Sequence, residues 1–130
     1  MTQKQEILLV CTNCQNITDF KAFTGVCLNC GDNIMEARYD LDKINVKEWL
    51  VNLKARPATL WRYHEVLPIY DTRNIVSMGE GGTPLLKSEH LGASLGLSNL
   101  YIKDERQGPT GSFKDRQATV AITALKEMGI

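Results

Sequence analysis

The sequence predicts an α/β fold: an open αβα sheet, of which the chain holds an incomplete part, preceded by a small β segment. Three observations predict it. Four cysteines lie in the first quarter of the chain as two CxxC pairs. Residues 100–103 alternate apolar and polar side chains as a short strand does, and apolar residues then recur at helical spacing from Ala118 to Met128. We place the boundary between the two parts after residue 40, which gives segments 1–40 and 41–130.

The four cysteines predict a metal site. Cys11 and Cys14 form one CxxC pair and Cys27 and Cys30 form the other, with 12 residues between the pairs. Two such knuckles bring four thiolates together in the tetrahedral arrangement that zinc prefers. Four sulfur ligands leave no position for water or substrate, so we expect a structural zinc in a ribbon-like segment. A segment of about 40 residues buries too little surface to fold alone, and metal binding would supply the missing free energy.

Two other uses of the cysteines remain open. Disulfides require an oxidising compartment, but residues 1–6 are polar and the apolar run 7–10 is too short for a secretion signal. We therefore expect a cytoplasmic protein with reduced thiols. A redox role for one CxxC pair would need a thioredoxin context, which the sequence lacks. Gly31 lets the chain turn back after the second pair, whereas Gln15 stands at the matching place in the first.

Two helices are predicted between the cysteines and the next glycine-rich stretch. Asp42 has the side chain of an N-cap, and Pro57 ends the first helix. The second helix is expected between Pro57 and Pro68. The apolar residues expected on the buried faces of the two helices are Ile44, Trp49, Leu50, Leu53, Leu60, Trp61, Val66 and Leu67. His64 and His90 have no partner at ligand spacing, so we expect them to be surface or packing residues.

Residues 79–82 (GEGG) predict a tight loop rather than a nucleotide site. Pro84 stands where the dinucleotide fingerprint needs its third glycine, and no Walker lysine follows. The loop is expected to lead into extended chain over residues 83–86. Ser88 should then cap a short helix that ends at Gly96.

Lys114 is the residue with the most informative position, because it lies where a loop turns into a helix. Ser112 followed three residues on by Asp115 is a capping-box pattern, which places Lys114 in the first turn. The positive end of the helix dipole favours the neutral amine there, and a neutral lysine forms Schiff bases with carbonyl compounds. The alternative is an ordinary solvated lysine. Gly129 should end the helix, and we expect the strand at 100–103 to belong to a parallel sheet.

Three motifs follow one another along the chain. They are residues 61–63 (WRY) with 67–68 (LP), residues 79–85 (GEGGTPL) and residues 109–116 (PTGSFKDR). In this order they resemble motifs of the threonine synthases and their relatives, the fold-type II pyridoxal phosphate enzymes. One subgroup of that family also carries a pair of CxxC pairs at its N-terminus, so the cysteine segment agrees with the lysine motif.

The resemblance implies the front part of a fold-type II enzyme. Lys114 would hold pyridoxal 5'-phosphate as a Schiff base and transfer protons, and Phe113 would share in binding the cofactor. Two positions differ from the family pattern: Gly108 stands where many relatives have Asn, and Gln117 stands where many have Gly. In the family further cofactor contacts come after the position of residue 130. We therefore expect these 130 residues to be about a third of a longer enzyme and to be inactive alone. The full-length enzyme is expected to be a homo-oligomer.

The implied reaction converts O-phospho-L-homoserine and water to L-threonine and phosphate. This would make the full-length protein a carbon–oxygen lyase acting on a small amino-acid substrate. Another fold-type II reaction, similar to that of cysteate synthase or threonine ammonia-lyase, remains open. So does a non-catalytic zinc-ribbon binding module.

Charge and composition exclude two classes of partner. Basic and acidic residues balance at 15 each, and the sequence pI is about 6.7. The sequence contains no basic patch of the kind that would predict nucleic-acid binding. No apolar run approaches the roughly 18 residues that a membrane span needs.

Overall fold

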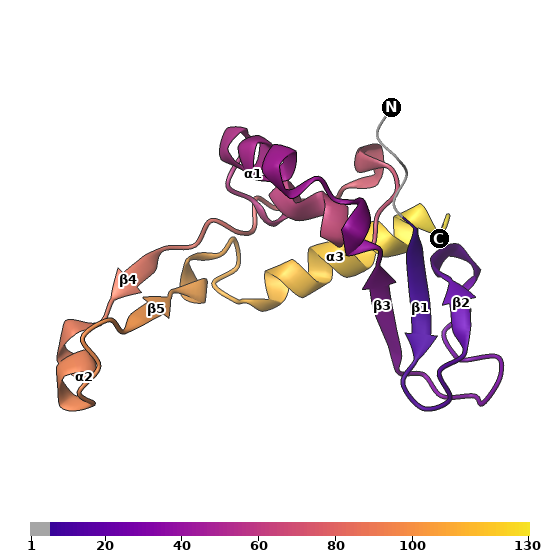
Figure 1. The fold of residues 1–130 in the computed structure, drawn as a ribbon, viewed down its shortest axis with the longest axis horizontal. Coiled ribbons are helices and arrows are strands. Elements are labelled where there is room, and N and C mark those ends of the chain that lie inside the picture. Colours follow the sequence, from indigo (N-terminus) through magenta and orange to yellow (C-terminus); the bar gives the residue numbers. More distant parts are fainter. Residues whose placement is uncertain (1–5) are drawn as a thin grey trace.

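The computed structural model describes residues 6–130. Figure 1 shows an elongated molecule with a three-stranded sheet at one end, a long central helix and an arm at the other end. The strands are β1 (Ile7–Cys11), β2 (Ile17–Asp19), β3 (Met35–Tyr39), β4 (Leu85–Lys87) and β5 (Tyr101–Lys103). The α-helices are α1 (Val46–Ala55), α2 (Glu89–Ser94) and α3 (Lys114–Glu127). Short 3-10 segments are η1 (Phe20–Ala22), η2 (Leu41–Lys43), η3 (Leu60–Val66), η4 (Thr72–Asn74) and η5 (Glu105–Gln107).

The N-terminal sheet is antiparallel, in the order β2-β1-β3. The sequence of β1 is ILLVC, and its apolar run suits a central strand because both of its faces are covered. Ile7, Leu9 and Phe20 form the buried core of this part. Side chains outside the first 40 residues complete it, since Tyr70, Ala124 and Met128 pack against the core. Residues 1–5 of the predicted segment 1–40 lie outside the described residues.

The first predicted helix forms, but it begins later than expected. Its N-cap is Asn45, whose side chain accepts a hydrogen bond from the backbone N–H of Glu48 at 3.4 Å. Asp42 instead lies in η2, so the prediction that it caps the helix was wrong. The chain is extended at Ile44 (φ −85°, ψ 114°), and a helix cannot run through that conformation. Helix α1 ends at Ala55, before Pro57 as predicted.

The second predicted helix is replaced by the 3-10 segment η3, which kinks at Tyr63 (φ −103°, ψ 25°). A side chain competes for the helix backbone here. The guanidinium of Arg56 donates to the carbonyl of Arg62 at 2.6 Å and pairs with Glu65 at 2.5 and 2.8 Å. His64 lies half-buried beside Glu65 (3.6 Å between Nε2 and Oε1), which agrees with a packing role.

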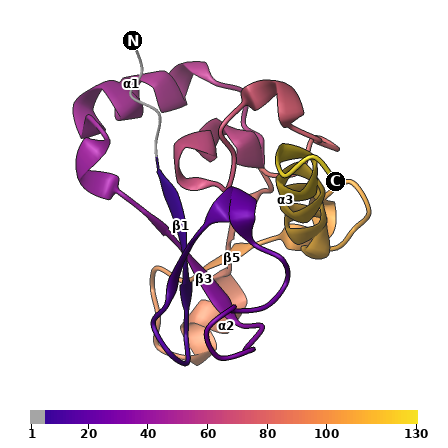
Figure 2. The same cartoon turned by 90° about the vertical axis from the view of Figure 1, so that its right-hand side faces the viewer.

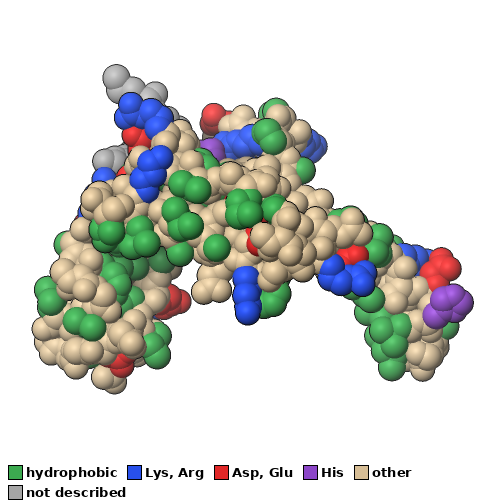
Figure 3. Space-filling model, turned by 180° about the vertical axis from the view of Figure 1, so that it is seen from behind, with side chains coloured by type: hydrophobic (Ala, Val, Ile, Leu, Met, Phe, Trp, Pro, Cys, Tyr) green, Lys and Arg blue, Asp and Glu red, His purple; other side chains and the backbone are tan. Residues whose placement is uncertain are grey.

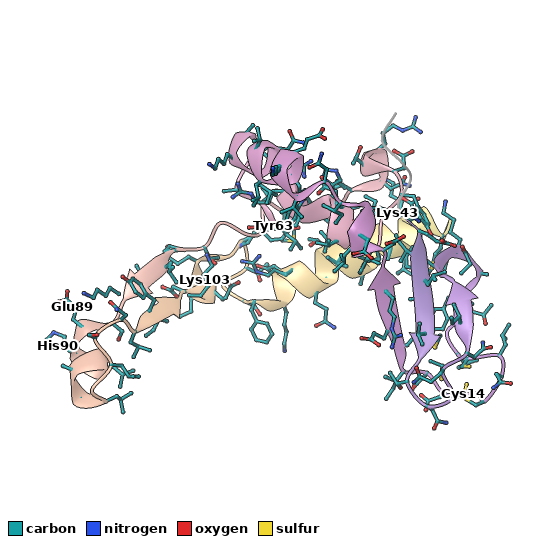
Figure 4. The ribbon with its side chains drawn as sticks, in the orientation of Figure 1. Cys14, Lys43, Tyr63, Glu89, His90 and Lys103 are labelled. Carbon is teal, nitrogen blue, oxygen red and sulfur yellow. The ribbon has the colours of Figure 1, made fainter. Side chains whose placement is uncertain are left out.

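The arm consists of β4, α2 and β5. Its two strands pair antiparallel, with Leu86 opposite Ile102, so the predicted parallel pairing at 100–103 was wrong. The chain turns back at Gly96 (φ +70°), directly after α2, and this reversal sends β5 along β4 in the opposite direction. Ser88 stands at the N-cap position of α2 as predicted, but its side chain makes no capping hydrogen bond. Figure 4 labels His90 at the far end of the arm, where it is exposed.

Much of the apolar surface of the arm is exposed, and Figure 3 shows hydrophobic side chains on it. The side chains concerned are Leu85, Leu86, Leu91, Leu95, Leu97, Tyr101 and Ile102. None of the helices in residues 6–130 has the length and apolar character that crossing a bilayer requires.

Helix α3 ends as the sequence predicted, with Gly129 (φ +82°) following its last turn, but its N-cap is Phe113 rather than Ser112. It nevertheless buries its polar side. The buried stripe consists of Asp115, Thr119, Thr123 and Glu127, spaced four residues apart. Ile122 and Leu125, on the apolar face, are 51% and 45% exposed. The stripe therefore holds α3 to the rest of the chain by hydrogen bonds, whereas Ile122 and Leu125 are open to solvent.

The loop at 79–82 lies tightly against the backbone before η3. The carbonyl of Glu80 accepts a hydrogen bond from the N–H of Leu60 at 2.7 Å. A Cβ at Gly81 (φ +109°) would lie 2.4 Å from that same nitrogen, whereas a Cβ at Gly79 (φ +84°) would meet nothing within 4 Å. The predicted tight loop is thus confirmed, and at Gly81 the absence of a side chain is required.

Replacing Gly81 by Ala should therefore lower the free energy of unfolding more than replacing Gly79 by Ala. Both substitutions strain a left-handed backbone, but only the first also drives a methyl group into backbone atoms. Overpacking of this kind costs about 1–3 kcal/mol. Denaturant unfolding of the two variants measures the difference. Equal losses would contradict the close approach.

Candidate active site and metal centre

The four cysteines meet at one point. Their Sγ atoms all lie within 4.8 Å of one another, and the Cys11–Cys30 and Cys14–Cys27 distances are both 3.6 Å. Tetrahedral zinc with bonds of about 2.3 Å separates its sulfur ligands by roughly 3.8 Å, so the thiols have the spacing of a metal site. All four are free thiols rather than disulfides. Figure 4 shows Cys14 at the tip of the three-stranded sheet.

The two knuckles share one backbone conformation. The N–H of Gln15 donates to the carbonyl of Cys11 at 3.0 Å, and the N–H of Gly31 donates to that of Cys27 at 2.8 Å. Both turn residues have positive φ, 59° for Gln15 and 77° for Gly31. The predicted turn at Gly31 is confirmed, and Gln15 adopts the same turn despite its side chain. The two CxxC pairs therefore enter the cysteine cluster with the same backbone geometry.

The thiols influence one another's protonation. A hydrogen bond from Asn29 leads the effects that lower the pKa of Cys14 to about 6. At Cys30 a backbone hydrogen bond from Asp32 acts downward, but interaction with Cys14 and burial outweigh it and raise the pKa to about 12. The cluster therefore combines a stabilised thiolate with a retained proton. A metal ion would displace such a proton on binding.

Lys114 lies in the first turn of α3, as the sequence predicted; it is the first residue of the helix, and it is exposed. Its N–H donates to the hydroxyl of Ser112 at 3.3 Å. Within residues 6–130, its Nζ makes no hydrogen bond or ion pair, so the amine is free to react with a carbonyl compound. Phe113, the residue before it, is 64% exposed and precedes the helix without a side-chain cap.

The predicted capping box does not form. Asp115 is buried, and its carboxylate accepts hydrogen bonds from the N–H of Thr110 at 3.0 Å and from the Thr110 hydroxyl rather than reaching back to Ser112. Thr110 is a better partner because the loop folds over the helix start. A Cβ at Gly108 would lie 3.0 Å from the same carboxylate, so the glycine leaves room for this contact. Asp115 thus fastens the lysine loop to the turn that carries Lys114.

Glu105 joins the lysine motif to the glycine motif. Its carboxylate accepts from the Thr83 hydroxyl at 2.7 Å and from the Arg116 guanidinium at 2.8 and 3.0 Å. The amine of Lys103 donates to the Thr83 carbonyl, and Figure 4 labels Lys103 where the arm meets the centre. Hydrogen bonds from Arg116 and Thr83 lower the pKa of Glu105 to about 2. Two motifs separated in sequence are therefore neighbours at the start of α3.

Acidification should weaken this junction. Because the folded-state pKa of Glu105 lies near 2, below its ordinary value of 4.5, the pairing stabilises the fold above pH 4.5 and is lost as the pH falls toward 2. Glu105→Gln should lose less stability over that window than the native chain. Unfolding curves at several pH values measure the slope. Arg116→Gln should likewise flatten the pH dependence of the free energy of unfolding over this window. An unchanged slope in both variants would refute the pairing.

Glu80 provides a second anchor, which sequence reasoning missed. It is 1% exposed, and its carboxylate accepts from the Thr119 hydroxyl (2.7 Å), the Met78 N–H (2.7 Å) and the Ser77 hydroxyl (3.0 Å). Burial acts to raise the pKa of Glu80, but these hydrogen bonds outweigh it and lower the pKa. The four-residue spacing of the polar stripe on α3 was the available signal. It places Thr119 one turn after Asp115.

Comparison with known proteins agrees with this arrangement. Residues 76–130, which contain the glycine and lysine motifs, match the family described as pyridoxal-phosphate dependent enzyme. The predicted α/β fold class and the resemblance to fold-type II pyridoxal phosphate enzymes are therefore confirmed.

Within that class the chain is similar to threonine synthases. It is 41% identical over 120 residues to the threonine synthase of Methanocaldococcus jannaschii, which covers 92% of this chain and 29% of that protein. Identity to the threonine synthase of Methanosarcina acetivorans is 38% over 104 residues, which cover 80% of this chain and 24% of that protein. Identity to the threonine synthase of Halalkalibacterium halodurans is 41% over 70 residues, which cover 54% of this chain and 20% of that protein. The chain thus spans less than a third of the length of these relatives.

Proposed function

We propose that Lys114 binds pyridoxal 5'-phosphate as a Schiff base in a threonine synthase-like enzyme. The whole protein would convert O-phospho-L-homoserine and water to L-threonine and phosphate. The observation that carries the proposal is an exposed lysine amine at the start of α3, without a partner among residues 6–130 and inside the region that matches the cofactor-dependent family. The similarity to threonine synthases supports the choice of reaction.

The residues around Lys114 suit this role. When bound, the cofactor supplies an electron sink that stabilises a carbanion next to the amino group. Lys114 would bind the cofactor and then move a proton with the same Nζ, which needs a reproducible position. Asp115 and Glu105 support that position, because both fasten the turn around Lys114 by buried or half-buried hydrogen bonds. The exposed ring of Phe113, next to it, is proposed to share in cofactor binding.

The four cysteines are proposed to hold a structural zinc ion. Their sulfur spacing supports tetrahedral coordination, and four thiolates would close the site to water and substrate. A cytoplasmic, reducing setting belongs to the same proposal, because coordination needs reduced thiols. We further propose residues 1–40 and 41–130 as the two units, supported by the end of β3 at Tyr39. A homo-oligomeric state of the whole protein is also part of the proposal.

Product analysis with the whole protein tests the reaction. Incubation with O-phospho-L-homoserine should release threonine and phosphate in equal amounts, and threonine alone should release no ammonia. Ammonia and a 2-oxo acid from threonine would instead indicate a deaminase. Incorporation of sulfite into a phosphorylated serine substrate would indicate a cysteate synthase.

A further inference from the structure

The last turn of α3 ends on a buried carboxylate. The side chain of Glu127 is only 2% exposed. It accepts hydrogen bonds from the side-chain amide of Asn74 at 2.7 Å and from the N–H of Asp71 at 3.3 Å, and it forms an ion pair with Lys21 at 3.3 Å. Lys21 supplies the one cation within salt-bridge distance of it among residues 6–130. The position of this end of α3 thus depends partly on a residue more than 100 positions earlier in the chain.

Lys21 belongs to the inter-pair segment, residues 15–26 between the two CxxC pairs. It lies in η1, where the Asp19 carboxylate accepts from its N–H at 2.8 Å, and its Nζ lies 5.1 Å from the centre of the Tyr70 ring. The neighbouring Phe20 is buried and packs edge-on against Tyr70, with ring centroids 6.2 Å apart. Figures 1 and 2 both place the β2-β1-β3 sheet beside the C-terminal end of α3. The inter-pair segment therefore docks on the helix that begins with Lys114.

The cysteine cluster closes the inter-pair segment at both ends. Cys14 precedes the segment and Cys27 follows it, and their Sγ atoms lie 3.6 Å apart. Without metal the ends of this segment can separate, and the segment has more conformational freedom. A metal ion that ties the ends together removes this freedom, so the inter-pair segment is better ordered with metal than without it. Ordering of the segment in turn places Lys21 against Glu127. A helix of 14 residues is about 21 Å long and moves as a rod, so a tilt at Glu127 displaces Lys114 at the other end.

We propose that Lys21 and Glu127 are positioning residues for Lys114, and that through them metal binding at the cysteines and cofactor binding at Lys114 are energetically coupled. The inference rests on the proposed metal site and the proposed cofactor role. Coupling between two sites is reciprocal, so zinc should tighten cofactor binding by the same factor by which the cofactor tightens zinc binding.

The test uses the whole protein and three measurements. They are zinc affinity by competition with a chromophoric chelator, pyridoxal phosphate affinity by absorbance, and hydrogen exchange over residues 120–128. In the native protein, zinc removal should speed exchange in this segment at least tenfold. It should also weaken pyridoxal phosphate binding about 5-fold or more, within the usual range for coupled sites.

Variants assign the coupling to the ion pair. Lys21→Met keeps the aliphatic stem but should reduce both coupling factors to near one, and Lys21→Arg should restore them. Lys126→Met, at the neighbouring exposed position of α3, is the matched control and should retain native coupling. Equal zinc affinities with and without cofactor, in a protein that binds both, would overturn the inference alone. A protein that binds no zinc, or no cofactor at Lys114, would overturn the corresponding proposed function together with it.

Discussion

Lys114→Ala in the whole protein should abolish the Schiff-base absorbance band and lower kcat/KM for O-phospho-L-homoserine by about 10³-fold or more. The loss is large because one amine is proposed to do two tasks, the covalent attachment of the cofactor and the transfer of a proton. The methyl group of alanine can do neither. Absorbance titration with pyridoxal phosphate and steady-state kinetics measure the two effects separately.

Borohydride reduction assigns the amine directly. Treatment of the native protein in the presence of pyridoxal phosphate, followed by digestion, should tag the peptide that contains Lys114. Lys126→Ala is the control, because that lysine is also exposed on α3 but lies at its other end. The Lys126→Ala variant should keep the native absorbance band, and reduction should tag the same peptide, the one that contains Lys114. A tag on another lysine, or a band that persists in Lys114→Ala, would refute the assignment.

The parts of the fold that sequence predicted depend on local signals. The helix from Lys114 to Glu127 follows from apolar spacing and a terminal glycine, and the cysteine cluster follows from two CxxC pairs. Within the helix, and within each CxxC pair, the residues that determine the structure lie within a few positions of one another. The elements that differ are decided by specific side-chain contacts that periodicity does not contain. Arg56 binds the carbonyl of Arg62, which no helix pattern contains, and η3 forms in place of a regular helix.

The candidate site shows the same division. Lys114 could be placed in a first turn because the loop-to-helix transition is local. Two of the hydrogen bonds that anchor the region around the start of α3 could not be predicted, because they join distant positions: Glu80 with Thr119, and Thr83 with Glu105. Apolar periodicity also drew attention to the wrong face of α3. The polar stripe is buried because its hydroxyls and carboxylates find partners in the loops, as when Thr123 accepts from the N–H of Val76 at 2.9 Å.

Cys27→Ser should remove bound zinc from the whole protein and unfold the three-stranded sheet. Cys27 is 1% exposed, so a serine there would bury a hydroxyl while removing a sulfur ligand. Structural zinc sites contribute apparent binding free energies of about 10–16 kcal/mol in small peptides, comparable with the total stability of a domain. Native mass spectrometry should show no zinc in the variant, and hydrogen exchange should show loss of protection in β1 and β3.

Leu28→Ala is the matched control for this prediction. Leu28 lies in the same knuckle, between Cys27 and Cys30, but it is 76% exposed and offers no ligand atom. It should keep one zinc ion per chain and native protection of β1. Retention of zinc in Cys27→Ser with an intact sheet would contradict the structural role. The core of Ile7, Leu9 and Phe20 would then suffice without metal, because Tyr70, Ala124 and Met128 complete it from outside the cysteine segment.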